Sequence, residues 1–129
     1  MAVGVLTSQA YDPSNAVYSA IYTADAAPTA SAIRCGFVPR FILLQQVAGA
    51  PAAVNKAEWH DGATAGTAAA WSATSVPSVI AASNGFVLLT GAEATPAANA
   101  TNSPASGAGF TVGTGVQTAS IVYSIKAFK

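Results

Sequence analysis

Charged side chains are scarce in this chain of 129 residues. Only 8% of the residues are charged, with five Lys or Arg against five Asp or Glu, and the formal net charge is zero. Soluble domains usually carry about 25% charged residues, so much of this surface must be uncharged or in contact with another molecule. Without a basic excess there is no electrostatic footprint for phosphate backbones or anionic lipid. We therefore expect neither nucleic acid nor a membrane as a partner, whereas close packing of many copies is favoured.

Cysteine and long apolar runs are also nearly absent. The single Cys35 has no intrachain partner for a disulfide, and we predict a free, buried thiol. The first residues lack a basic segment and a long apolar stretch, so secretory export is not indicated. No uninterrupted apolar run approaches the roughly 20 residues that span a bilayer. A membrane-spanning segment is therefore not expected.

Long helices are disfavoured although Ala is abundant. Seven prolines recur at short intervals, and Lys, Glu, Gln and Leu, which usually accompany Ala in helices, are scarce. Thr, Ser, Val and Gly fill the intervals instead, which is typical of strands and turns. The length suits one domain. Its Ala-rich core buries little apolar area per residue, so contact with neighbouring copies would add useful burial.

Apolar runs rich in β-branched and aromatic residues, separated by turn signals, predict about eight short strands. The strongest turn signals are Asp61-Gly62 and Asn84-Gly85. In the last run, Ile121, Tyr123 and Ile125 alternate with more polar residues and are expected to face the core. The sequence therefore predicts an all-β, single-domain sandwich or barrel. The candidate runs are residues 17–23, 31–35, 40–47, 54–60, 68–72, 79–80, 86–90, 109–112 and 120–128.

Two segments are predicted to lie outside the packed strands. Residues 1–16 carry Val3, Val5 and Leu6 but no pattern long enough for a core element, which indicates an extended arm that adds to a neighbour's sheet edge. Residues 17–129 would then form the β-rich domain. Residues 93–107 are small and polar with two prolines, and are expected to form a long exposed loop, either mobile or docked on a neighbour. The alternative for both is an unattached tail and an unattached loop.

A recurring layout of short motifs runs from about residue 33 to residue 128. It resembles small virion structural proteins of tailed bacteriophages, in particular head decoration (cement) proteins. The motifs, which precede a final apolar strand, are 36–42 (GFVPRFI), Glu58-Trp59 followed by a turn, 84–86 (NGF) and 109–113 (GFTVG).

That resemblance implies a fold, a location and a partner. The expected fold is a β-sandwich or a β-tulip-like domain. The protein would be made in the host cytoplasm and would bind the outer capsid surface of the virion, often as a homotrimer, where it bridges subunits of the major capsid protein. The resemblance carries no catalytic set and no cofactor, and we expect a structural protein that is not an enzyme.

The aromatic residues admit a structural and a binding interpretation. Phe37, Phe41, Phe86 and Phe110 are predicted core anchors, because large rings partly compensate for many alanines, and three of them follow a glycine. Trp59 and Trp71 flank the Asp61-Gly62 turn and are expected to pack against each other across a hairpin. In the alternative function, a tail-fibre or host-binding module, Trp59, Trp71 and Tyr11 would stack on glycans.

Potential catalytic or metal-binding groups are few. Glu58, His60 and Asp61 cluster in the sequence, with Glu58 and His60 on one face of a strand, but further ligands at suitable spacing are lacking. We interpret them as a solvated hairpin end. His60 is the single histidine, and no Gly-x-Ser-x-Gly elbow accompanies it. We therefore expect no catalytic site, no metal and no cofactor.

Overall fold

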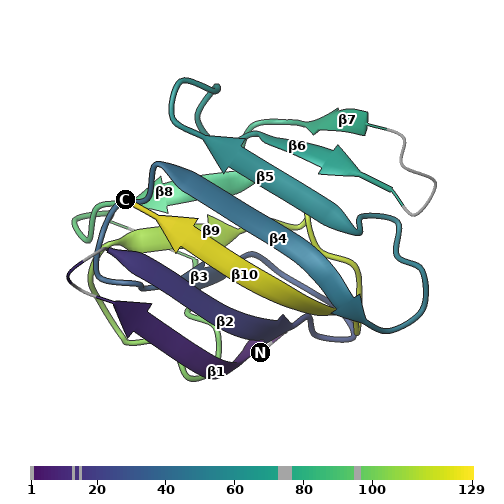
Figure 1. The fold of residues 1–129 in the computed structure, drawn as a ribbon, viewed down its shortest axis with the longest axis horizontal. Coiled ribbons are helices and arrows are strands. Elements are labelled where there is room, and N and C mark those ends of the chain that lie inside the picture. The colour runs from purple at the N-terminus through teal and green to yellow at the C-terminus, as the bar shows by residue number, and fades with distance from the viewer. Residues whose placement is uncertain (1, 13, 15, 73–76, 95–96) are drawn as a thin grey trace.

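The protein is built from β-strands arranged in two layers. The computed structural model describes residues 2–12, 14, 16–72, 77–94 and 97–129, and no helix occurs within these ranges (Figure 1). The strands, in chain order, are β1 (Val5–Asp12), β2 (Val17–Thr23), β3 (Ser31–Ile33), β4 (Phe41–Ala48), β5 (Lys56–His60), β6 (Ala68–Trp71), β7 (Pro77–Ile80), β8 (Phe86–Leu89), β9 (Gly109–Val112) and β10 (Val122–Phe128).

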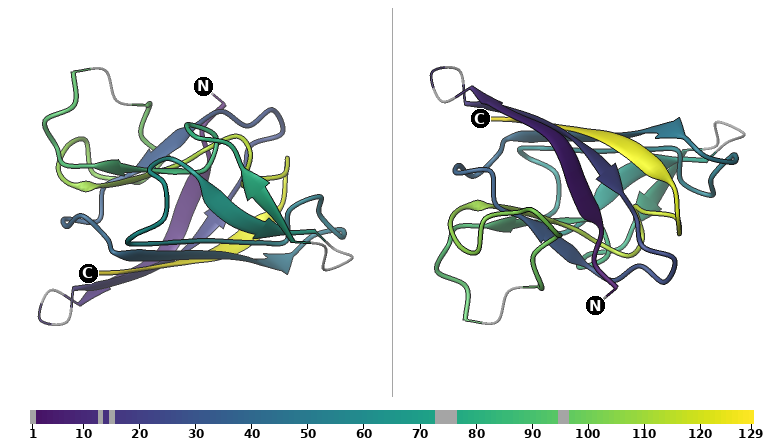
Figure 2. Two further views of the ribbon diagram at one scale, coloured as in Figure 1. Left: turned by 90° about the horizontal axis from the view of Figure 1, so that it is seen from above. Right: turned by 90° about the horizontal axis from the view of Figure 1, so that it is seen from below.

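The strands form one large and one small antiparallel sheet. The seven-stranded sheet has the order β1-β2-β10-β4-β5-β6-β7, and the three-stranded sheet has the order β3-β9-β8. Figure 2 shows the small sheet against one face of the large sheet, with the opposite face of the large sheet uncovered. The all-β prediction is therefore confirmed, with ten strands arranged as a sandwich. Nine of the ten overlap the predicted runs, and β1 is the addition.

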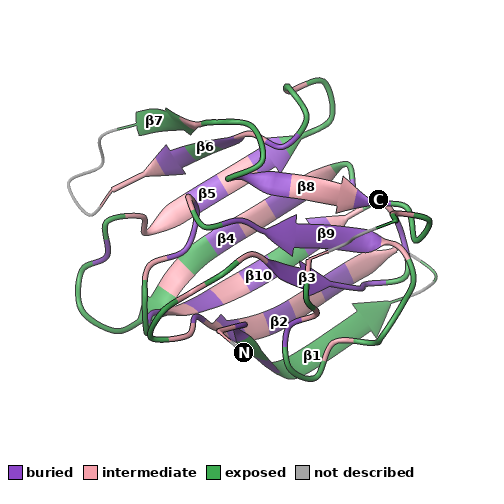
Figure 3. Ribbon diagram, turned by 180° about the vertical axis from the view of Figure 1, so that it is seen from behind, coloured by how far each residue is buried: buried purple, intermediate pink, exposed green. Residues whose placement is uncertain are grey.

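Alternating side chains place the core between the two sheets. Burial alternates along β2 and β10, and Ile121, Tyr123 and Ile125 are buried as predicted (Figure 3). Phe86 and Phe110 are fully buried and meet edge to face, with ring centroids 6.3 Å apart. Such a pair adds about 0.5–1.5 kcal/mol beyond its buried area. This contact joins β8 to β9 within the small sheet and places both rings in the core between the two sheets.

One buried amide links the strands to the connections around them. The Tyr22 hydroxyl donates to Gln117 Oε1 at 2.7 Å, and Gln117 Nε2 donates to the carbonyls of Thr29, Val112 and Gly113 at 3.0–3.3 Å. Gln117 is only 6% exposed. A buried amide is tolerated where its donors and acceptor are satisfied, so this network fixes one arrangement of the surrounding backbone.

The prediction of a separate N-terminal arm is wrong. Residues Val5–Asp12 form β1, which pairs with β2 of the same chain. Leu6 is 1% exposed and Val3 is buried, whereas Val5 keeps 38% of its surface exposed. The pairing register shifts between Thr7 and Ala10, at a bulge that interrupts the two-residue alternation by which strands are recognised. The division between residues 1–16 and 17–129 is therefore not a structural boundary.

The predicted loop at residues 93–107 is largely exposed where the structure describes it, with residues 95 and 96 outside the described ranges, and part of it is docked on its own chain. Ala32 N donates to Ala98 O, and Ala100 N donates to Ala32 O, both at 2.8 Å. Leu6 N donates to Thr101 O at 3.0 Å. Residues 98–101, hereafter the bridging segment, thus lie in parallel bridges with β3 on one side and β1 on the other. They join the adjacent edges of the two sheets, so docking on a neighbour is not required.

Three of the four predicted phenylalanine anchors lie in the core. Phe37, Phe86 and Phe110 are buried, whereas Phe41 is half-buried on the outer face of the large sheet. Its ring lies 5.9 Å from that of Phe128, which occupies the paired position on β10. The assignment of Phe41 as a core anchor is wrong. Successive side chains of a strand point to opposite faces, and because Ile42 and Leu44 point inward, Phe41 points outward.

Candidate functional site

None of the other described strands covers the outer face of the seven-stranded sheet. The small sheet packs on the opposite face, as Figures 1 and 3 show from the two sides. Side chains that point outward on β2, β10 and β4 lie next to one another because the strands pair in register. Six of them are apolar and half-buried by their neighbours, and we call this set the apolar outer patch. Its members are Val17, Ile21, Phe41, Leu43, Val122 and Phe128.

The patch continues across the paired strands. Phe128 is opposite Val17 on β2 and opposite Phe41 on β4. Leu43 is flanked by two charged residues, Lys126 on β10 and Glu58 on β5. Ser19, Lys126 and Ser124 separate Ile21 and Val122 from the other four members. Exposed apolar side chains that gather on one sheet face commonly mark contact with another macromolecule. The arrangement therefore suits burial against a partner.

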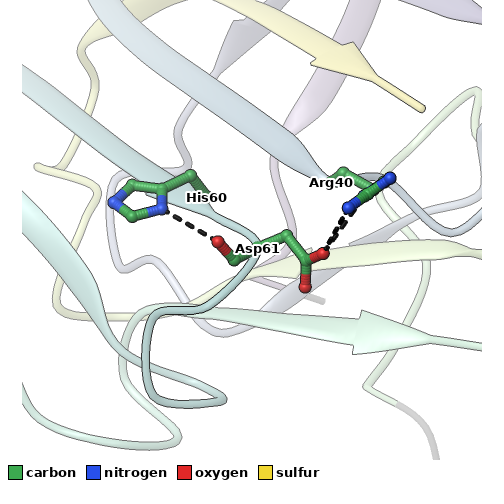
Figure 4. A network of polar contacts seen from close by, with 3 residues as sticks. All are labelled: Arg40, His60 and Asp61. Carbon is green, nitrogen blue, oxygen red and sulfur yellow. Dashed lines mark hydrogen bonds and ion pairs between the residues drawn. The ribbon is translucent and has the colours of Figure 1, made fainter.

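His60 and Asp61 lie at the exposed end of a hairpin, as predicted, whereas Glu58 lies half-buried in the middle of β5. Asp61 Oδ2 accepts from Arg40 Nη2 at 2.9 Å and from Nε at 3.1 Å, and both side chains are more than half exposed. His60 Nδ1 lies 3.1 Å from the backbone oxygen of Asp61, not from its carboxylate (Figure 4). Glu58 forms no hydrogen bond or ion pair with these residues, and its Oε2 lies 4.0 Å from Lys56 Nζ. Exposed ion pairs contribute about 0–1 kcal/mol, so these contacts hold the turn only weakly.

The two tryptophans lie on opposite faces of the sheet, so the predicted packing between them is wrong. Trp59 faces the core at 5% exposure, and its Nε1 donates to Thr64 O at 3.2 Å. Trp71 pairs with Lys56 and faces outward, with the Lys56 ammonium 4.9 Å from its ring centroid. Three positions separate Lys56 from Trp59, an odd number, so the two side chains of β5 point to opposite sides.

A cleft of about 350 Å³ opens beside Trp71. Its other lining residues are Gln45, Gln46, Asn55 and Lys56. Cross-strand register places Gln45 opposite Lys56 and Lys56 opposite Trp71. Of the five lining residues, the sequence predicted a binding role for Trp71 only. The amide side chains come from neighbouring strands, and only the pairing register shows that they lie beside Trp71.

Arg34 is a buried charge that sequence reasoning did not single out. The residue is 6% exposed. Arg34 Nε donates to Asn99 Oδ1 at 3.1 Å, and Nη1 donates to the Gly107 carbonyl at 2.8 Å. Within the described ranges it forms no ion pair. Because buried guanidinium groups require acceptors, Arg34 fixes the loop that carries the bridging segment.

Cys35 is a free, buried thiol, as predicted. Its Sγ lies 3.3 Å from the Phe37 carbonyl, and burial raises its pKa. A raised pKa lowers the thiolate fraction and with it the reactivity of the thiol. Tyr11, the third residue of the predicted glycan platform, is 49% exposed and stacks on Phe37 with ring centroids 6.1 Å apart.

Glu93 makes stability depend on pH. Its carboxylate accepts from the backbone amides of Thr90 and Gly91 and from the Thr90 hydroxyl, and these bonds lower its pKa from the usual 4.5 to about 2. A lowered pKa in the folded state contributes stability above the unfolded value, and that contribution is lost as pH falls through the folded value. We expect Glu93→Gln to lower the melting temperature at pH 7 and to have a much smaller effect near pH 2, where about half of the folded molecules carry a protonated carboxyl group.

Thermal unfolding followed by circular dichroism between pH 7 and pH 2 measures this difference. Glu58→Gln is the matched control, since Glu58 has only the long contact with Lys56. If the effect of Glu93→Gln is the same at every pH, the backbone bonds to the carboxylate do not stabilise the fold.

Within the described residues, no helix is long and apolar enough to cross a bilayer, and no three His, Cys, Asp or Glu side chains gather in a way that could hold a metal ion. Comparison with protein-family models, with curated proteins and with solved structures finds no match for this chain.

Proposed function

We propose that this protein is a structural, non-enzymatic component of a tailed-phage virion that decorates the outer capsid surface. It would dock the apolar outer patch against the major capsid protein and bridge adjacent subunits. The observation that carries the proposal is the uncovered outer face of the seven-stranded sheet, where Phe41, Leu43 and Phe128 lie side by side. The low charge of the chain agrees with a surface that is buried in an assembly.

The dimensions of the face support such a contact. With strands spaced about 4.8 Å apart and a rise of about 3.3 Å per residue, the seven strands cover roughly 700 Å². A stable protein interface buries about 800 Å² on each partner. One sheet face therefore supplies most of the contact area that a single docking event requires.

Repetition would strengthen a modest contact. Linked copies bind with avidity far above that of one site when their geometry matches the spacing of the shell. The homotrimer expected from the resemblance would provide this linkage. Light scattering during size exclusion tests this part of the proposal, and a stable monomer at micromolar concentration would contradict it.

A charge placed in the apolar outer patch tests the docking surface. We expect Ile21→Asp to weaken binding to shells by at least about tenfold, because a carboxylate buried at an interface without a partner costs several kcal/mol. Ile21 points outward on β2, so the domain should keep its fold. Binding is measured by co-sedimentation with shells assembled, without this protein, from the major capsid protein of the same genome.

The matched control places the same charge on the other side of the molecule. Ser106→Asp lies in the exposed loop beside the small sheet and should bind as the unmodified protein does. Circular dichroism verifies that both variants are folded. Equal binding by Ile21→Asp and Ser106→Asp would show that the outer patch does not dock, and failure of the unmodified protein to bind the shells would refute the proposed function.

A further inference from the structure

We propose that the cleft beside Trp71 is a binding site for a neutral pyranoside glycan. The cleft lies on the outer face over β4, β5 and β6, next to the apolar outer patch. Four of its five lining residues are polar and the fifth is an indole. This inference rests on a different set of side chains and a different ligand from the capsid proposal. Because both surfaces lie on one sheet face, a capsid that covered all seven strands would also cover the cleft, so the glycan would be bound by the free protein.

The walls of the cleft are fixed by the strand ladder and by one side chain. Gln46 N donates to Asn55 O at 2.7 Å, and Asn55 N donates to Trp71 O at 2.9 Å. The Gln46 amide is engaged in the following turn, where its Nε2 donates to Ala50 O at 2.6 Å and its Oε1 accepts from Ala52 N at 3.3 Å. The backbone of the site and the Gln46 side chain are therefore held before any ligand arrives, which reduces the entropy lost on binding.

Two side-chain amides in the cleft have no partner in the described structure. The side chains of Gln45 and Asn55 form no hydrogen bond with any described residue, whereas that of Gln46 does. Each free amide offers one acceptor oxygen and two N–H donors. Neighbouring sugar hydroxyl groups both donate and accept, so a pair of amides matches them better than a pair of like-charged groups would.

Trp71 provides the apolar wall that a sugar ring needs. The indole is half-buried and lines the cleft, and the negative potential of an aromatic face attracts the C–H groups of a pyranose. The same potential already holds the Lys56 ammonium 4.9 Å from the ring centroid. Because Glu58 lies 4.0 Å from that ammonium, the local charge is balanced and a neutral glycan is favoured over an acidic one.

The emission of the two tryptophans separates this site from the rest of the protein. Trp59 is 5% exposed and Trp71 lines the cleft, so a bound sugar should change only the Trp71 component of the fluorescence. An array of neutral and acidic glycans identifies the best ligand, which is then titrated by fluorescence. Trp59→Phe should retain the response, and Trp71→Ala should lose it together with at least about tenfold in affinity.

Further variants assign the amides and the charge. Gln45→Ala and Asn55→Ala should each weaken binding several-fold, while Lys126→Met, an exposed position on β10 that does not line the cleft, should leave it unchanged. Circular dichroism establishes that each variant is folded. An array without any bound glycan, binding unaffected by Trp71→Ala, or binding confined to acidic glycans and lost in Lys56→Met would each overturn the proposal. None of these results depends on whether the protein binds capsids.

Discussion

The free energy of unfolding of Phe86→Ala is expected to fall by about 3–5 kcal/mol. Phe86 is fully buried on β8 and meets Phe110 of β9 edge to face. Removing the ring deletes a large share of the aromatic contact in a core otherwise rich in alanine, and the backbone of two sheets cannot close the cavity. Because whole domains are stable by only about 5–15 kcal/mol, this single change should bring the protein close to unfolding.

Urea denaturation followed by circular dichroism gives the value. Phe41→Ala is the matched control, since the same side chain is removed from the outer face, and it should cost about 1 kcal/mol because Phe41 remains partly solvated. If the two variants lose equal stability, the ring of Phe86 does not occupy the core as described.

Gly109→Ala should cost about 3 kcal/mol or more, or prevent folding altogether. A Cβ at this position would lie 1.9 Å from Ile33 O and 2.9 Å from Arg34 Cα. Both contacts are with backbone, which the pairing of β3 with β9 holds in place, so relief requires the two strands to separate. The expected result is a large fall in soluble yield and in the urea midpoint.

Gly107→Ala distinguishes this steric effect from backbone strain. Gly107 has φ of +110°, but an added Cβ there would meet no atom within 4 Å. Its cost should be about 1–2 kcal/mol, the usual cost of an unfavourable left-handed conformation. Equal losses for the two variants would mean that the close approach of β9 to β3 does not limit stability.

Alternation and turn chemistry were sufficient to predict most of the fold. The last strand follows the two-residue period without interruption, so its inward residues were identified correctly. The first strand was missed because its bulge interrupts that period and because most of its side chains are exposed. Local patterns identify regular strands well, and they fail where a strand is irregular.

The candidate sites were less predictable because they depend on which strands pair. Alternation along β5 is enough to place Trp59 and Lys56 on opposite faces of the sheet. Only the pairing register of β5 with β6 shows that Lys56 lies beside Trp71. The apolar outer patch likewise requires β10 between β2 and β4, an order that no local pattern encodes. The acceptors of Arg34 come from residues 99 and 107, which are also distant in sequence.

The position of β10 sets the order of events during synthesis. β10 lies between β2 and β4, so the centre of the large sheet cannot close until residues 122–128 have been made. From Thr23 to Val122, a paired couple 99 positions apart, a ribosome adding about 5–20 residues per second needs on the order of 5–20 s. Throughout that interval β2 lacks its partner strand β10, and the backbone groups of β2 that face β10 are unpaired. Nascent chains are therefore most prone to aggregation and to chaperone binding before β10 emerges. The risk is greatest where several ribosomes on one mRNA hold identical unfinished chains close together.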